Sequence, residues 1–291
     1  GGPCGGGDYN PAMVRAWGRR ALALAALGFW YLSYVYVTLP DVRPLVTENP
    51  TTTAFMELRV REARAQGRDL RPQQRWVPYS RISPQLTRAV LVAEDSAFWQ
   101  HDGLDFDQIR ESFEYNLERG EFARGASTIT QQLAKNLYLS PSRNPLRKLR
   151  EVMIARRLEA VLSKRRILEI YLNVIEWGDG VFGAEAAARA HFRASASGLG
   201  AEQAALLAAA IINPRQLDPG QPSARLLRRQ RMLLRRMGRA TPPPDTGSAA
   251  RAGEAAEPPP VTAPVEPAPA SPAPAEAAPP VPPRGQGGGP L

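Results

Sequence analysis

The chain has 291 residues, of which 43% are hydrophobic and 22% charged, and its formal net charge is +9. This length allows one or two domains. The single cysteine, Cys4, excludes a disulfide framework, and the two histidines, His101 and His191, exclude a three-histidine metal site. The 51 residues from Thr241 onward include 16 prolines and 12 alanines. Because this composition has too little bulky apolar area to offset the entropy of ordering, we expect residues 241–291 to be a disordered Pro/Ala-rich tail.

The first element predicted along the chain is a membrane anchor. Residues 21–39 carry no charge and span about 28 Å at helical rise, close to the thickness of the hydrocarbon core. Three arginines lie just before this run, within residues 11–20, whereas Arg43 is the only basic residue soon after it. The positive-inside rule then places residues 1–20 in the cytoplasm and everything after the helix across the membrane. Since no small-x-small cleavage site follows, we expect an uncleaved anchor rather than a signal peptide or a buried core helix.

After the anchor we expect a juxtamembrane segment over residues 40–78, in which ENPTTTAFM is an extended-looking run, and then a globular domain over residues 79–240. In that domain the apolar residues recur at helical spacing, with proline and glycine at the joints. The predicted helices are 84–98, 105–118, 128–139, 145–163, 165–176, 183–192, 201–212 and 223–238. We see no βαβ alternation and no hairpin signal, so the predicted fold class is mainly α.

The first group of residues that could carry chemistry is AEDSAFWQHDGLDFDQI, residues 93–109. Glu94 ends an apolar helical run, where desolvation would raise the pKa of a carboxyl group and suit it to general acid/base work. The alternative is a helix end and an acidic loop that face water, and the spacing alone favours this alternative. A metal site fits less well, because one histidine with scattered aspartates matches no usual ligand spacing.

The second group is RGASTITQQLAKN, residues 124–136. Thr128 and Gln131 fit a capping box, and the N–H groups at such a helix start attract anions. Gln131 and Lys135 lie one turn apart on one face. No lysine directly follows the glycine, which excludes a P-loop. An ordinary capped amphipathic helix is an equally good interpretation of this stretch.

The third group is a basic helix within residues 142–173. Its first turns hold Arg143, Arg147, Lys148 and Arg150. Because the helix dipole disfavours cations there, the pattern indicates an anionic partner, and Glu151 supplies a second carboxylate one turn from Lys148. All three lysines of the chain lie between residues 135 and 164, which favours ammonium groups used as phosphate ligands. The alternatives are a solvated face or attraction to anionic lipid.

In chain order, the motifs of residues 48–237 resemble those of glycosyltransferase family 51, the peptidoglycan glycosyltransferases, and in particular its monofunctional members. The motifs are ENPTTTAFM, WVPYSRIS, EDSAFWQHDGLD, ASTITQQLAKNLYLSPSR, RKLRE, KRRILEIYLNVIEWGDGVFGAEAAA and INP. Two positions depart from the family pattern: Ala126 stands where a glycine is usual, and Ile212 where a proline is usual. Ala126 could stiffen the loop that precedes the capped helix.

The resemblance implies a lysozyme-like glycosyltransferase domain that polymerises lipid II into β-1,4-linked glycan strands, with inversion at C1 of the donor and release of undecaprenyl diphosphate. It implies that Glu94 deprotonates the 4-hydroxyl of the acceptor sugar. Lys135, Arg143 and Lys148 match the diphosphate contacts of the family. Glu151 matches its second catalytic-site glutamate, which assists the donor side or holds a cation, Mg or Mn.

The resemblance also implies supporting roles for Asp95, Ser127 and Gln132. The expected location is the inner membrane, with the catalytic domain in the periplasm. The expected partners are lipid II, the growing lipid-linked glycan chain and inner-membrane lipid, together with penicillin-binding proteins and proteins of the division and elongation machinery. We expect no nucleic acid partner and no ATP chemistry, because the site faces away from the cytoplasm.

The sequence contains neither S-x-x-K nor K-T-G, the motifs of penicillin-binding transpeptidase domains, so we expect no transpeptidase activity. Two other functions compete with glycan polymerisation. A lysozyme-type muramidase would also use paired carboxylates, but it has no diphosphate for the cations around Glu151 to neutralise. A membrane-anchored scaffold without activity would not need Glu94, Lys135, Arg143 and Glu151. The tail is itself a candidate scaffold element that reaches toward partners or wall.

Overall fold

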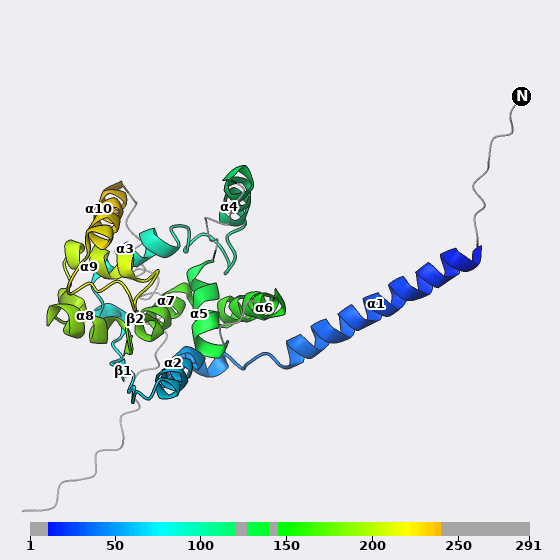
Figure 1. Cartoon of the computed structure of the whole chain (residues 1–291), viewed down its shortest axis with the longest axis horizontal. Helices are drawn as coiled ribbons and strands as arrows, with labels where there is room; N and C mark the ends of the chain where they lie inside the picture. The colour runs from blue at the N-terminus through cyan, green and yellow to red at the C-terminus, as the bar shows by residue number, and fades with distance from the viewer. Residues whose placement is uncertain (1–10, 120–126, 140–144, 240–291) are drawn as a thin grey trace, which may run out of the picture. The chain divides into compact units, whose positions relative to one another are not determined.

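The structure is a computed structural model, and it describes residues 11–119, 127–139 and 145–239 (Figure 1). Its helices are α1 (Pro11–Val37), α2 (Ala54–Ala65), α3 (Pro84–Glu94), α4 (Phe106–Arg119), α5 (Ile129–Tyr138), α6 (Pro145–Val161), α7 (Lys164–Val174), α8 (Ala184–Phe192), α9 (Ala201–Ala210) and α10 (Ala224–Arg239). Short 3₁₀ turns are η1 (Arg43–Val46), η2 (Tyr79–Arg81) and η3 (Ala196–Gly198). The predicted mainly α class is confirmed, and each of the eight helices predicted between residues 84 and 238 is present.

Helix α1 contains the predicted anchor. Its part from Arg15 to Val37 is long and apolar enough to cross a membrane, and its residues are largely exposed. At its C-terminal end Val35 is buried, and two arginines of α6 reach the chain just after it. Arg150 Nη2 donates to the Thr38 carbonyl at 3.1 Å, and Arg157 Nη1 donates to the Leu39 carbonyl at 3.3 Å. These bonds join the end of the apolar helix to the folded domain.

The core of the domain forms where two groups of helices pack. Helix α9 packs against α3 and α10, and α5 packs against α2, α6 and α7 (Figure 1). The buried alanines of α9, residues 204–205 and 208–210, let the α3 backbone approach closely. On the other side, the side chains of Tyr171 and Trp177 are almost wholly buried. This packing brings the C-terminal end of α3 next to the first turns of α5, which is where the candidate site lies.

The expectation of an extended run through ENPTTTAFM is wrong from residue 54 onward, because Ala54–Ala65 forms α2. Three threonines in a row favour extended backbone, but the last of them caps a helix: Thr53 Oγ1 accepts a hydrogen bond from Met56 N at 3.1 Å. Met56 and Ala63 are buried, and α2 packs against α5. Part of the segment expected to be juxtamembrane therefore contributes to the packing of the domain.

A small sheet was also missed. It has three strands in the order β1–β3–β2, with β1 (Gln73–Gln74) parallel to β3 (Val181–Phe182) and β2 (Glu176–Gly178) antiparallel to β3. The two residues between β2 and β3 are Asp179 and Gly180, and Gly180 has φ +75°. Asp-Gly is a strong two-residue hairpin signal, so a hairpin signal was present in the sequence after all.

Candidate active site

Glu94 is the last residue of α3 and one side of the site. Its Oε2 accepts a hydrogen bond from Gln132 Nε2 of α5 at 2.8 Å, and the Tyr171 hydroxyl of α7 donates to Gln132 Oε1 at 2.9 Å. Burial raises the pKa of Glu94, while the bond from Gln132 and the charges of Arg229 and Lys135 lower it. The net direction is upward, in line with desolvation of a carboxyl group at the end of this apolar helix. Glu94 is half-buried, whereas Asp102 and Asp107 of the acidic loop face water.

The capping box predicted at the start of α5 is present. Thr128 Oγ1 accepts from Gln131 N at 3.2 Å, and Gln131 Oε1 accepts from Thr128 N at 3.1 Å. The side-chain oxygen of Gln131 is therefore engaged in the cap, and the residue is buried. The next residue, Gln132, faces the carboxylate, so the cap fixes the direction in which α5 presents Gln132 and, one turn later, Lys135.

Glu151 forms the second side of the site on α6. It is 3% exposed, and each of its oxygens meets a cation from the preceding turn of the same helix. Lys148 Nζ lies 2.5 Å from Oε1 and Arg147 Nη1 lies 3.0 Å from Oε2. Lys148 Nζ also donates to Ser127 Oγ at 3.2 Å, which ties α6 to the residue before the α5 cap. Arg143 lies outside the described residues.

Lys135 lies between the two carboxylates. Among the residues that the structure describes, its ammonium group makes no hydrogen bond and no ion pair. Burial lowers the pKa of Lys135, while the charges of Glu151 and Glu94 raise it. Lys135 and Gln132 border a cleft of about 250 Å³ that Arg59, Asn213 and Arg215 also line. An ammonium group without a partner beside a cleft is suited to bind an anion that enters it.

The geometry around Glu151 does not fit the expected Mg or Mn ion. Both carboxylate oxygens already meet a cation, and a divalent ion would have to displace Arg147 or Lys148 from them.

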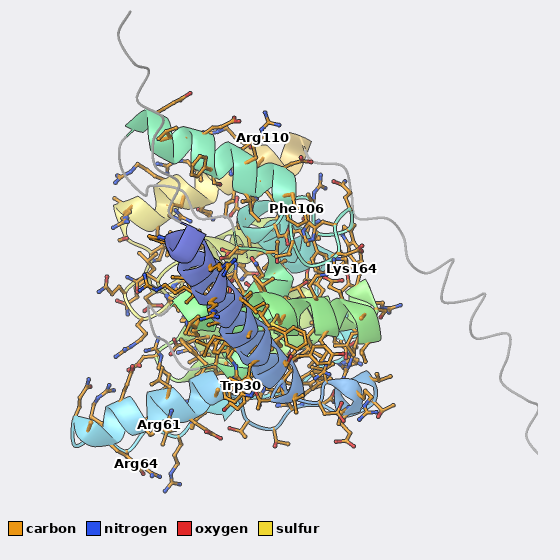
Figure 2. All side chains as sticks on the ribbon, turned by 90° about the vertical axis from the view of Figure 1, so that its right-hand side faces the viewer. Trp30, Arg61, Arg64, Phe106, Arg110 and Lys164 are labelled. Carbon is orange, nitrogen blue, oxygen red and sulfur yellow. The ribbon has the colours of Figure 1, made fainter. Side chains whose placement is uncertain are left out.

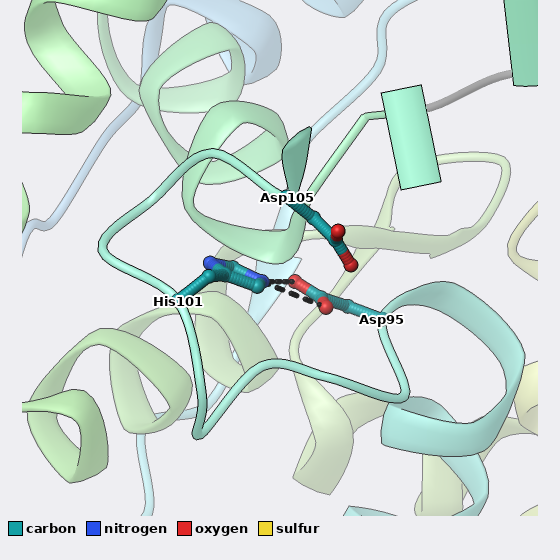
Figure 3. A group of neighbouring side chains, drawn as sticks. All are labelled: Asp95, His101 and Asp105. Carbon is teal, nitrogen blue, oxygen red and sulfur yellow. Dashed lines mark hydrogen bonds and ion pairs between the residues drawn. The ribbon is translucent and has the colours of Figure 1, made fainter. Parts of the chain in front are cut away.

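A second metal candidate lies in the loop that follows α3, where ligand atoms of Asp95, His101 and Asp105 come within 4.8 Å of one another (Figure 3). The three residues are thus less scattered in space than their spacing suggested. Their atoms, however, have other partners. Gly103 N donates to His101 Nδ1 at 3.2 Å, so the proton of this ring lies on Nε2, which donates to Asp95 at 3.0 Å. Asp105 Oδ1 accepts from Gln108 N at 2.8 Å and caps α4.

Asp95 itself is 1% exposed and has a structural function in this group. Its Oδ2 accepts a hydrogen bond from Ile129 N at 3.0 Å, at the start of α5. Thr128 Oγ1 donates to the Gly103 carbonyl at 2.7 Å. These bonds join the loop after α3 to the start of α5, and so hold Glu94 and Gln132 at a fixed separation.

The structure thus brings together seven of the eight residues predicted for the site, on α3, α5 and α6 and next to their ends. Three pairings of these residues were not predicted, those of Tyr171 with Gln132, Arg147 with Glu151 and His101 with Asp95, although Arg147 and His101 belong to the groups that the sequence singled out. Two of these had a signal in the sequence. Tyr171 carries a hydroxyl on the apolar face of a helix, and a buried hydroxyl needs a partner. Arg147 precedes Glu151 by four residues, which is the spacing of a helical ion pair.

A half-buried carboxyl group with a raised pKa beside a cluster of cations has the chemistry of a general base next to an anion-binding site. Comparison with known proteins identifies the class further. The Transglycosylase family matches residues 62–238 of this chain. The chain is 51% identical over 195 residues to the biosynthetic peptidoglycan transglycosylase of Nitrosospira multiformis, an alignment that covers 67% of this chain and 85% of the relative.

Two further relatives carry the same description. That of Laribacter hongkongensis is 53% identical over 189 residues, 65% of this chain and 83% of the relative. That of Aromatoleum aromaticum is 47% identical over 230 residues, 79% of this chain and 98% of the relative. The chain belongs to the transglycosylase family and is a glycosyltransferase of peptidoglycan synthesis. Its apolar helix α1 fits a membrane-anchored enzyme.

Proposed function

We propose that this enzyme polymerises lipid II into β-1,4-linked glycan strands, inverts C1 of the donor and releases undecaprenyl diphosphate, without cross-linking the strands. One observation carries the proposal: the ammonium group of Lys135, which has no partner among the described residues, borders a cleft and interacts electrostatically with both Glu94, a carboxyl group with a raised pKa, and Glu151, a carboxylate with two cations. This arrangement supplies a base on one side and positive charge on the other.

On the acceptor side, Glu94 takes the proton of the 4-hydroxyl of N-acetylglucosamine. The hydroxyl oxygen then attacks C1 of the lipid-linked muramic acid of the growing chain, from the face opposite the leaving group. A bond forms between this oxygen and C1 while the bond from C1 to the diphosphate oxygen breaks, so C1 inverts. The raised pKa of Glu94 suits it to this proton transfer near neutral pH, and Gln132 orients the carboxylate.

On the donor side, the electron pair of the broken bond leaves with undecaprenyl diphosphate, and negative charge builds up there. Fixed cations stabilise such a transition state more than the ground state. Lys135 has this role, together with Lys148 and Arg143. Glu151 holds Lys148 at 2.5 Å, and Lys148 in turn contacts Ser127, so the cation is positioned before the substrate arrives.

The substrate and product are lipid-linked, and we place the enzyme at the inner membrane with its N-terminus in the cytoplasm and its domain in the periplasm. The apolar α1 and the charge bias before it support this placement. Helix α4 is a second argument for a position at the membrane surface, because four large apolar side chains along one of its faces are exposed. They are Phe106, Ile109, Phe113 and Leu117. Penicillin-binding proteins, which would cross-link the strands, and proteins of the division and elongation machinery remain the proposed partners.

The test is glycan polymerisation from labelled lipid II by the wild type and by Glu94→Gln, with the products separated on a gel and digested with lysozyme. We expect lysozyme-sensitive polymer from the wild type and at least about a hundredfold less from the variant, because the base is removed. The matched control is Glu57→Gln, which makes the same chemical change at an exposed carboxylate of α2 and should leave polymerisation unchanged.

The other outcomes separate the alternatives. Equal polymer from the wild type and Glu94→Gln would overturn the assignment of Glu94 but keep the reaction. Shortening of preformed glycan strands by the wild type would favour a muramidase. No polymer from any variant, with lipid supplied, would favour the inactive scaffold.

A further inference from the structure

A second cavity, of about 350 Å³, lies outside the candidate active site. Its walls come from the stretch between β1 and η2, from α8 and from the residues around η3. The WVPYSRIS motif, which the proposed reaction does not use, forms part of one wall. The cavity and the active-site cleft share no lining residue. Helix α7 connects the two regions, because it contacts η2 and α8 as well as α5, which carries Gln132 and Lys135.

The cavity is strongly cationic. Three guanidinium groups border it, those of Arg75, Arg81 and Arg189, and only one carboxylate, that of Glu185. Among the residues with described positions, the side chains of Arg75 and Arg81 form no ion pair and no hydrogen bond. Their guanidinium N–H groups can therefore donate to a ligand that enters the cavity from solution.

Glu185 offsets only part of this positive charge: it interacts electrostatically with Arg75, but each of its oxygens accepts its hydrogen bond from another group. Oε1 accepts from Arg189 Nε at 2.7 Å, and Oε2 accepts from Ala196 N at 2.7 Å. Glu185 is 5% exposed, and although burial raises its pKa, the bonds from Ala196 and Arg189 lower it below the ordinary value. The carboxylate thus stays ionised, holds η3 against α8 and pairs with Arg189.

The other residues that line the cavity offer a hydroxyl donor and an apolar surface, which suit a ligand with polar and apolar parts beside its charged group. Ser195 Oγ and Ser197 Oγ lie 3.0 Å apart, so one hydroxyl donates to the other and one proton is left to donate to a ligand. Trp76 is half-buried, and the guanidinium of Arg166 lies 5.4 Å from the centre of its ring. The indole offers a fixed apolar surface next to the guanidinium groups.

We propose that this cavity is a second anion-binding site, which takes a carboxylate or phosphate group through the guanidinium groups of Arg75 and Arg81 and packs the rest of its ligand against Trp76. Guanidinium groups bind both kinds of anion through paired, charge-assisted hydrogen bonds. Such a site gives the domain a contact with an acidic peptide or a phosphorylated molecule that is separate from its reaction cleft. The proposal does not rest on the polymerisation reaction.

The experiment uses the full chain in a neutral detergent and two probes, inorganic phosphate and an acetylated, amidated Glu-Glu dipeptide. The indole N–H resonance of Trp76 reports on the cavity, and its disappearance in Trp76→Phe assigns it. We expect a saturable shift of this resonance with at least one probe, weakened by added salt. The double variant Arg75→Gln/Arg81→Gln should bind at least about tenfold more weakly, because it loses two charge-assisted contacts.

A matched control removes two positive charges elsewhere. Arg61 and Arg64 project from α2 into solvent (Figure 2), and Arg61→Gln/Arg64→Gln should leave the titration unchanged. A shift with phosphate alone identifies a phosphate-bearing ligand, and a shift with the dipeptide alone identifies a carboxylate. The proposal is overturned if neither probe shifts the resonance saturably, or if both double variants bind as tightly as the wild type.

Discussion

At the scale of single residues, the orientation of the Gln132 amide decides whether Glu94 meets a donor or an acceptor. Tyr171 sets this orientation, because its buried hydroxyl donates to Gln132 Oε1 and so turns Nε2 toward the carboxylate. Burial raises the pKa of Tyr171 well above its ordinary value, so the hydroxyl keeps its proton throughout the range in which Glu94 titrates. Tyr171 is thus a positioning residue that acts on Glu94 through Gln132.

Tyr171→Phe should therefore lower kcat/KM for polymerisation by about tenfold, which corresponds to about 1.4 kcal/mol. It should also move the acidic limb of the pH–rate profile to higher pH. The reason is that the bond from Gln132 lowers the pKa of Glu94, and a disordered amide no longer provides it. Tyr138→Phe, at the end of α5, is the control and should change neither value. An unchanged acidic limb in Tyr171→Phe would show that the hydroxyl does not orient the amide.

The sequence was sufficient to predict which residues gather at the site but not how they pair. The order of the motifs predicted Glu94, Gln132, Lys135 and Glu151, and these residues converge. The pairing depends on side chains that meet across three helices. That Gln132 rather than Gln131 faces Glu94 follows from the capping box, which uses Gln131, and this distinction needs the rotation of α5 about its axis.

At the scale of elements, the loop between α3 and α4 links the carboxylate of one helix to the cap of another. Gly103 is central to this loop. It has φ +83°, its N–H donates to His101, and its carbonyl accepts from Thr128. A Cβ at this position would lie 2.9 Å from Glu159 Cγ. Glu159 cannot move away easily, because it is bonded to Thr130 and Lys164.

Gly103→Ala should consequently destabilise the fold by ~2–3 kcal/mol, from the strained backbone and the crowding together. Gly67→Ala is the matched control, since Gly67 also has a positive φ, +70°, but a Cβ there would meet nothing within 4 Å. It should cost only ~1 kcal/mol. Urea denaturation of both variants measures the difference. Equal losses would mean that the loop adjusts and that Gly103 is not a rigid link.

The elements themselves were predictable wherever a long apolar period dominated. The two errors are α2, which has 12 residues, and the small sheet, whose strands have two or three, and both depend on local chemistry. For α2 the deciding residue is Thr53, which caps a helix although its neighbours favour extended backbone. For β2 and β3 it is the Asp179–Gly180 turn, which joins strands too short to show an alternation. Strand β1 pairs with β3 across about a hundred residues of sequence, and no local pattern predicts such a pairing.

At the scale of the whole molecule, the site lowers the stability of the fold when Glu94 is ionised. Burial raises the pKa of Glu94, so the folded chain binds this proton more readily than the unfolded chain does. The stability linked to Glu94 is fully present below its pKa in the unfolded chain and is lost as the pH rises through the raised pKa of the folded chain. At the pH where Glu94 acts as a base, the fold therefore carries the cost of a buried negative charge.

Glu94→Gln removes that charge and keeps an oxygen that can accept from Gln132. We expect this inactive variant to have a higher Tm than the wild type at neutral and higher pH, and the difference to shrink as the pH falls below the ordinary pKa of glutamate.

Glu151→Gln should have the opposite effect and lower the free energy of unfolding by ~1–3 kcal/mol, because it leaves Arg147 and Lys148 facing a neutral group. The exposure of Lys148 keeps this loss below that of a fully buried pair. Thermal unfolding of both variants across pH distinguishes the two carboxylates. If Glu94→Gln were less stable than the wild type at every pH, Glu94 would be an ordinary structural carboxylate, and the proposed general base would have to be sought at another residue of the site.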